Sequence, residues 1–164
     1  RGRLRADDPS IRERLLSRYF RPYATAFAEL VTDHLVQHGR CTIVDLHSYA
    51  AQRLPYELGG DERPEVCIGT DPVHTPAWLH ELVVEVAARH GLTTANDTPF
   101  SGVYVPLDRY GVDRRVSAVM LELRRDLYLD ETTAHPHQGE VRVRRFVRDV
   151  VSDVGRATPS TTTC

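Results

Sequence analysis

Residues 42–48 have the sequence Thr-Ile-Val-Asp-Leu-His-Ser, in which an apolar run ends in a carboxylate and an imidazole. A strand over this segment places Asp45 and His47 on one face, because side chains two residues apart point the same way. Open α/β sheets bind ligands at the carboxyl ends of their strands, so the pair indicates a metal ligand or a catalytic base aimed at a pocket. The pattern is equally consistent with a histidine that is hydrogen-bonded at a strand end.

Helical patterns lie on both sides of this strand. Each has apolar residues three and four positions apart, and several begin at a proline or a capping residue. Two of the patterns stop at Gly39 and Gly91, as helices with a left-handed C-terminal residue do. The expected helices cover residues 9–19, 22–38, 76–90 and 143–154.

Further extended segments alternate with these helices. The mostly apolar run at residues 116–123 is expected to form a central strand, and residues 66–68 a short buried one. Extended pieces are also expected near residues 93–95 and 103–107. Strands that alternate with helices predict an α/β fold, with a mixed, largely parallel sheet flanked by helices.

Length and composition predict one domain. The chain has 164 residues, of which 41% are hydrophobic, which suffices for one compact core and is too short for two. We expect a single α/β domain over residues 1–156. The Ser/Thr-rich residues 157–164 are expected to be a disordered tail.

Charge and cysteine content exclude several classes of protein. A formal charge of -2 gives no basic excess, so no nucleic-acid partner is expected. No apolar run approaches the roughly 20 residues that cross a bilayer, so no membrane partner is expected. The three cysteines, Cys41, Cys67 and Cys164, contain no CxxC pair. They predict neither a disulfide framework nor a thiolate zinc site, and a cytoplasmic location is expected.

Several common catalytic motifs are absent from the sequence. His80 and Glu81 begin like a zinc-protease helix, but Val84 stands where the second histidine is required. His135 and His137 lie in a polar segment without further ligands at a suitable spacing, which favours a solvated loop. Neither a nucleophile elbow nor a phosphate-binding glycine loop is present.

Glu122 is a candidate general base. It lies within Val-Met-Leu-Glu-Leu at residues 119–123, where burial would penalise its charged form and raise its pKa. A carboxylate at the wet end of a strand, paired with Arg124 or Arg125, explains the pattern equally well. Arg109 and Tyr110 are candidates to bind a carboxylate, although a single arginine of this kind more often lies on the protein surface without such a role.

Four short motifs in order resemble the N-formylglutamate amidohydrolase family. They are DLHS at 45–48, Asn96 with the turn at 100–102, DRYG at 108–111, and LEL at 121–123 followed by Tyr128. The resemblance extends from about Tyr19 to about Glu131. It implies a fold like that of zinc carboxypeptidases and hydrolysis of the formyl amide of N-formylglutamate or of a related N-acyl amino acid.

The resemblance also implies roles for single residues. His47 would be a zinc ligand and Asp45 a neighbour that orients it. Glu122 would be the general base that takes a proton from water. Asn96, Arg109 and Tyr110 would bind the carboxylate of the substrate.

The family's other two zinc ligands belong to an upstream segment that residues 1–164 do not contain, so this sequence is expected to lack the N-terminal portion of the fold. Our first hypothesis is therefore a zinc-dependent amidohydrolase that is incomplete in this chain and inactive in isolation. The second is a non-catalytic domain that binds a small carboxylate and has lost the metal. A third is a structural α/β interaction domain, in which His47 and Glu122 are merely satisfied polar groups.

Overall fold

The computed structural model describes residues 8–55, 57 and 62–157. Within them a first pair of helices, joined by a π-helical turn at Leu16–Phe20, precedes a succession of strands and helices. A 3₁₀ turn at Arg125–Leu127 follows the last strand. The principal elements are α1 (Pro9–Leu15), α2 (Arg21–His38), β1 (Cys41–Tyr49), β2 (Val66–Gly69), α3 (Ala77–Arg89), β3 (Thr94–Asn96), β4 (Val116–Arg124) and α4 (Glu140–Arg156).

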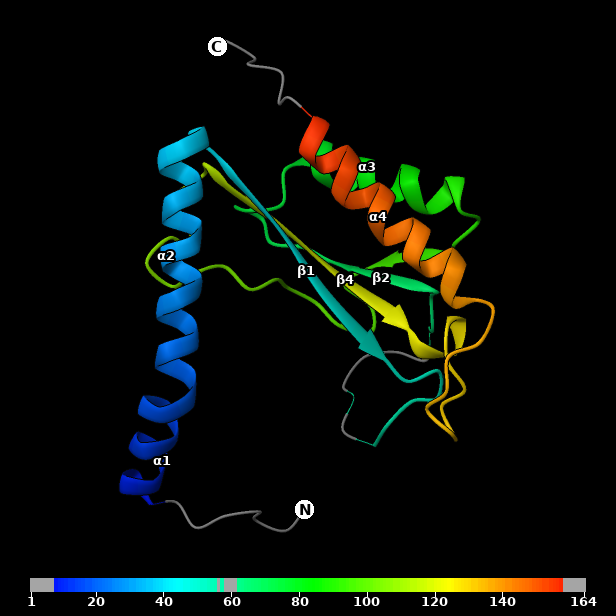
Figure 1. Ribbon diagram of the computed structural model, residues 1–164, viewed down its shortest axis with the longest axis horizontal. Helices are drawn as coiled ribbons and strands as arrows, with labels where there is room; N and C mark the ends of the chain where they lie inside the picture. The colour runs from blue at the N-terminus through cyan, green and yellow to red at the C-terminus, as the bar shows by residue number, and fades with distance from the viewer. Residues whose placement is uncertain (1–7, 56, 58–61, 158–164) are drawn as a thin grey trace.

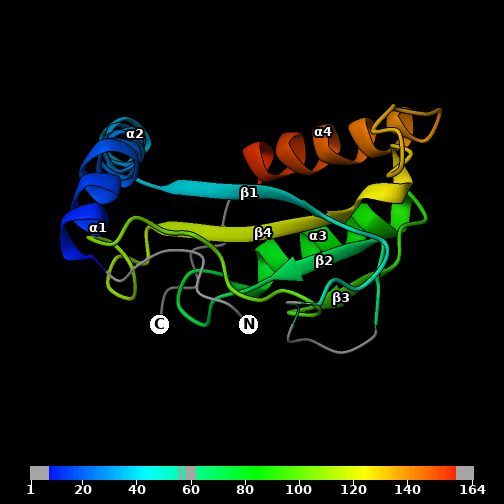
Figure 2. The same ribbon diagram turned by 90° about the horizontal axis from the view of Figure 1, so that it is seen from below.

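The strands form one mixed sheet in the order β1-β4-β2-β3. β4 runs parallel to β1 and antiparallel to β2, and β2 runs parallel to β3. Figure 2 shows this order from β1 at one edge to β3 at the other. The expected α/β class and largely parallel sheet are confirmed, as is the central position of the strand at residues 116–124.

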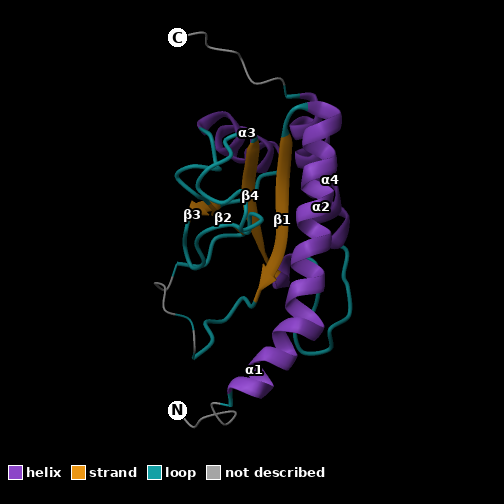
Figure 3. Ribbon diagram, turned by 90° about the vertical axis from the view of Figure 1, so that its left-hand side faces the viewer, coloured by secondary structure: helices purple, strands orange, loops and turns teal. Residues whose placement is uncertain are grey.

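Helices cover both faces of the sheet, with α2 on one side and α3 and α4 on the other (Figure 1). Side chains alternate between the faces of a strand, so each strand contributes to two cores. The α3 and α4 side holds a core around Ile68, Leu121 and Phe146, all fully buried. The α2 side holds a smaller core in which Val31 packs near Ala118. Figure 3 shows α2 running alongside β1.

Local sequence explains where the helices begin and end. Asp8 accepts a hydrogen bond from the backbone N–H of Ser10, which caps the start of α1. Gly39 ends α2 with φ of 72°, the left-handed conformation that glycine adopts without strain. α4 turns Val143, Phe146 and Val150 to the core at intervals of three and four residues. The helices expected in these regions are confirmed.

Two local features differ from expectation or lie beyond it. Residues 103–106 adopt no regular secondary structure, although Val105 is buried against α2. The five residues Leu16–Phe20 form a π-helical turn, which no periodicity in the sequence signalled.

Among the described residues, none of the helices is both long and apolar enough to cross a membrane. Cys164 lies outside the described residues, whereas Cys41 and Cys67 are free and buried.

Candidate active site

Glu122 and His47 lie side by side on the two longest strands. The register places the Cα of His47 opposite that of Glu122 across the parallel pair β1 and β4. Opposed residues in a sheet project to the same face, so the imidazole and the carboxyl emerge together. Cys67 of β2 extends this row on the other side of Glu122. The row lies toward the carboxyl ends of β1 and β4.

Asp45 holds the His47 imidazole. Its Oδ1 is 2.9 Å from Nε2 of the ring, and its Oδ2 accepts a longer hydrogen bond of 3.4 Å from the backbone N–H of Tyr104. The sequence-based expectation that Asp45 and His47 share a face is confirmed. About half of the His47 side chain, 49%, is exposed to solvent. Asp45 engages Nε2 of the ring, and Nδ1 has no partner among the described residues.

Glu122 is a buried acid with an unsatisfied oxygen. The residue is 9% exposed, and its Oε2 has no hydrogen-bond partner among the described residues. Burial raises the pKa of the carboxyl above its ordinary value, and the nearby side chains of His47 and Arg125 partly oppose that effect. The expectation that Glu122 is buried is confirmed. The raised pKa favours the protonated form of this carboxyl relative to an exposed glutamate.

A buried ion pair supports the loop that follows β1. Glu57 and Arg63 form this pair, with side-chain exposures of 1% and 13%. Arg63 also donates to the backbone carbonyls of Ala50 and Ala51. Sequence reasoning missed both residues, because an ion pair within a loop produces no periodic pattern.

Arg109 lies against α2 and has its charge compensated. Its Nη1 is 3.1 Å from Asp113, its Nη2 donates to the hydroxyl of Thr32 at 3.2 Å, and Asp108 lies 3.3 Å from Nε. The guanidinium therefore faces two carboxylates of its own loop. Whether it also binds a substrate carboxylate stays a prediction.

Tyr110 stacks on a histidine that sequence reasoning missed. The ring of His74 lies 5.8 Å from that of Tyr110, and it is fully buried. His74 Nδ1 lies 2.8 Å from the carbonyl oxygen of Val116, and Nε2 accepts the backbone N–H of Gly111 at 2.8 Å. His74 thus fixes the 108–111 loop to the beginning of β4. Val116 lies six residues before Glu122 on β4, which corresponds to about 20 Å along that strand.

Asn96 lies at the far side of the sheet. It ends β3, the edge strand opposite β1, and its Oδ1 is 2.8 Å from Nε2 of His80 on α3. The structure therefore brings Asp45, His47 and Glu122 together, whereas Asn96 and the Arg109–Tyr110 pair occupy other places. Their joint role in binding one substrate stays a prediction.

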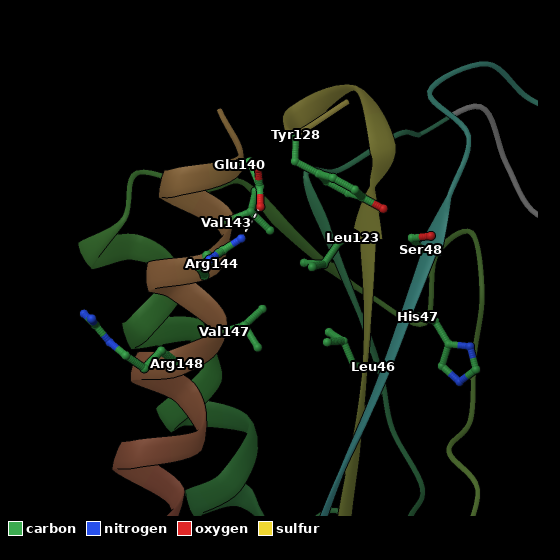
Figure 4. Close-up of a pocket in the computed structure, with 10 residues that line it drawn as sticks. All are labelled: Leu46, His47, Ser48, Leu123, Tyr128, Glu140, Val143, Arg144, Val147 and Arg148. Atoms are coloured by element: carbon green, nitrogen blue, oxygen red, sulfur yellow. Dashed lines mark hydrogen bonds and ion pairs between the residues drawn. The ribbon is translucent and has the colours of Figure 1, made fainter. Parts of the chain in front are cut away.

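A groove of about 800 Å³ runs between β1 and α4 on the opposite face of β1. Figure 4 shows Leu46, Leu123 and Val147 facing this groove, while the His47 side chain points away from it. His47 is among the residues that line the groove, although its side chain points away from it, and Glu122 is not among them.

The described residues do not complete a zinc centre. Catalytic zinc takes three protein ligands. No group of three His, Cys, Asp or Glu side chains that could hold a metal ion occurs within the described part of the chain. His137 contacts the carbonyl oxygen of Asp126 at 3.0 Å, in keeping with the expected loop. We therefore assign no reaction step to a metal ion.

Comparison with known families identifies the chain. The family profile of N-formylglutamate amidohydrolase matches residues 3–129, which include the His47–Glu122 row. The chain belongs to the N-formylglutamate amidohydrolase family. The resemblance carried by the four sequence motifs is thereby confirmed. A search of curated proteins returned no significant match.

Two crystal structures share the fold of this family member. One is N-formylglutamate amidohydrolase from Ralstonia eutropha JMP134, with a TM-score of 0.72 and 22% identity over 90% of this chain and 54% of that chain. The other is a gene product of Agrobacterium tumefaciens, with a TM-score of 0.63 and 19% identity over 90% of this chain and 56% of that one. The chain therefore spans about half the length of these two structures.

Proposed function

We propose that this chain supplies the Glu122 part of an amidohydrolase active site that acts on N-formylglutamate or a related N-acyl amino acid. The observation that supports the proposal is a buried, partnerless carboxyl directly beside an exposed imidazole, in a chain whose residues 3–129 match the family. Hydrolysis adds water to the amide carbonyl and breaks the C–N bond. In this scheme Glu122 accepts the proton of the attacking water and delivers it to the departing amine.

The proposal includes a zinc ion that is bound in part by His47. The remaining ligands would come from outside the described residues, because those residues offer no group of three. Asp45 would fix the ring orientation and raise the basicity of the ligating nitrogen. The 54% and 56% coverage of the two related structures is consistent with a site completed by further chain.

The test of the catalytic role is Glu122→Gln in the protein expressed from its complete reading frame. Loss of a general base should lower kcat by about a hundred- to ten-thousand-fold. Release of amine from formyl and acetyl amino acids measures the rate. Glu85→Gln, an exposed change on α3, is the control and should keep full activity. Unchanged turnover in Glu122→Gln would refute the proposal.

Metal analysis tests the zinc part separately. Asp45→Asn should weaken zinc binding by about 10- to 100-fold if His47 is a ligand, because the partner of a ligating histidine sets its orientation. Zinc content would be measured after dialysis against a graded chelator. Equal zinc retention in Asp45→Asn and the unaltered protein would contradict this role.

A second candidate function is a non-catalytic domain that binds a small carboxylate. The absence of a three-ligand group among the described residues favours it. A protein from the complete reading frame that contains no stoichiometric zinc, yet binds N-acyl amino acids, would support this alternative. Stoichiometric zinc would exclude it.

A further inference from the structure

A small basic pocket lies at the opposite end of the sheet from Glu122. It has a volume of about 180 Å³ and lies where β1 and β4 begin, beside the last turn of α4. In Figure 1 this is the end of β1 that adjoins the end of α2. Because β1 and β4 are parallel, their first residues are separated from the Glu122 row by most of the length of the sheet. The pocket is therefore distinct from the candidate active site.

Three arginines line this pocket. Arg40 comes from the turn between α2 and β1, and Arg114 and Arg115 come from the segment before β4. None of the described lining residues carries a carboxylate. Arg115 is held by Asp113, whose oxygens lie 2.9 and 2.8 Å from its Nε and Nη2. The carboxylate of Asp113 neutralises one cation, which leaves a net positive charge at the pocket.

The other two arginines have no partner among the described residues. Neither Arg40 nor Arg114 forms a hydrogen bond or an ion pair within that part of the chain. Their guanidinium groups present forked donors that match the oxygens of a phosphate or carboxylate. Arginines from two separate segments thus converge on one small space without an internal anion to bind.

Two hydroxyl groups and an aromatic ring complete the pocket. Thr42 of β1 and Ser117 of β4 are opposed in the register and lie on the same face, and both line the pocket. Trp78 contributes a wall from the first turn of α3. Neither hydroxyl has a hydrogen-bond partner among the described residues, so both are available to donate to a bound oxygen.

The pocket has room for a small anion. Its volume is about 180 Å³, and Arg40, Thr42 and Val154 also line a larger neighbouring groove of about 780 Å³. We propose that this pocket binds a phosphate group, held by Arg40 and Arg114 and by the hydroxyls of Thr42 and Ser117. A dianion with several acceptor oxygens uses two forked cations and two hydroxyl donors better than a monoanion does.

Calorimetric titration of the chain with inorganic phosphate tests the proposal. The expected result is saturable binding of one phosphate per chain, weakened about tenfold by Arg40→Gln and by Arg114→Gln, as loss of one charge-assisted hydrogen bond predicts. Both side chains are exposed and unpartnered within the described residues, so the variants should fold, which circular dichroism would verify. Thr42→Val should weaken binding without a change in net charge.

The control is Arg14→Gln, which removes one exposed arginine from α1 and should leave phosphate binding intact. An equal loss of affinity in Arg14→Gln and Arg40→Gln would show non-specific attraction and overturn the proposal. So would the absence of saturable binding, or tighter binding of acetate than of phosphate at equal ionic strength. If glycerol 3-phosphate binds as tightly as phosphate, the ligand of the pocket is a phosphomonoester. If phosphate binds and glycerol 3-phosphate does not, the ligand is the free anion.

Discussion

The guanidinium of Arg63 lies over the ring of Tyr49, with its Cζ 4.7 Å from the ring centroid. Arg63 also forms the buried ion pair with Glu57, and the Tyr49 hydroxyl donates to the carbonyl of Pro64. These contacts join the end of β1 to the segment that leads into β2. They hold the backbone on one side of the His47–Glu122 row.

Replacement of Arg63 by Met should destabilise the chain by about 3–5 kcal/mol, because Glu57 would remain buried without its partner. Urea unfolding followed by circular dichroism measures the change. The matched control is Arg21→Met, which breaks an ion pair with Glu13 whose side chains are 54% and 60% exposed. Exposed pairs contribute about 0–1 kcal/mol, so a loss in Arg21→Met as large as in Arg63→Met would contradict the burial argument.

Glu122 should make the chain less stable as the pH rises. Burial raises the carboxyl pKa in the folded state above that of the unfolded state, so the folded chain binds more protons between those two values. The free energy of unfolding therefore falls as the pH rises from the unfolded pKa, about 4.3, to the raised folded pKa. Glu122→Gln should remove this decline. The free energy of unfolding would be measured by urea unfolding at each pH for Glu122→Gln and for the unaltered chain. If the two profiles ran parallel, the pKa of Glu122 would not be raised in the folded state.

A methyl group at Gly69 should not fit. A Cβ added at Gly69 would clash with the carbonyl oxygen of Gly102 and with the side chain of Met120. The Gly102 oxygen belongs to the backbone, so it cannot move aside. Gly69→Ala should cost about 1–3 kcal/mol by overpacking. Gly155→Ala is the control, because nothing lies within 4 Å of its added Cβ and alanine favours helix α4. In thermal unfolding, the Tm of Gly69→Ala should lie below that of the unaltered chain, and the Tm of Gly155→Ala should lie above it.

His74→Leu should loosen the 108–111 loop. The change removes the acceptor of the Gly111 N–H and the partner of the Val116 carbonyl, each worth about 1–3 kcal/mol when buried and unsatisfied. Hydrogen exchange of the Gly111 amide should accelerate. Exchange at Phe146, in the core of α4, should change only as far as the global free energy of unfolding does. Unchanged exchange at Gly111 would show that His74 does not anchor the loop.

Much of the fold could be predicted from the sequence because its signals are local. Proline at the start of a helix and glycine at its end depend on neighbouring residues alone, and Gly39 and Pro76 both mark boundaries in the structure. The π-helical turn at Leu16–Phe20 was not predicted, because the same apolar spacing suits a regular helix. The irregular path of residues 103–106 depends on packing against α2, which no local pattern encodes.

The candidate site was predicted only where strand geometry dictates it. The alternation of side chains fixed the common face of Asp45 and His47, and an apolar neighbourhood implied the burial of Glu122. His74 was missed, although Asp71 and Pro72 before it carry the chemistry of a turn and Asp71 accepts the His74 N–H. Asn96 and Arg109 could not be placed from sequence, because their positions depend on long-range strand pairing.

β1 is an edge strand that pairs only with β4 among the described residues, so the backbone groups along its outer side carry no sheet partner. Leu46, 49% exposed, adds an apolar contact beside that row. Bare edges of this length without proline or lysine are prone to pair with any extended chain. When purified alone and concentrated, this polypeptide should therefore self-associate. Either free arginine in the buffer or a charged substitution at Leu46 should reduce this self-association.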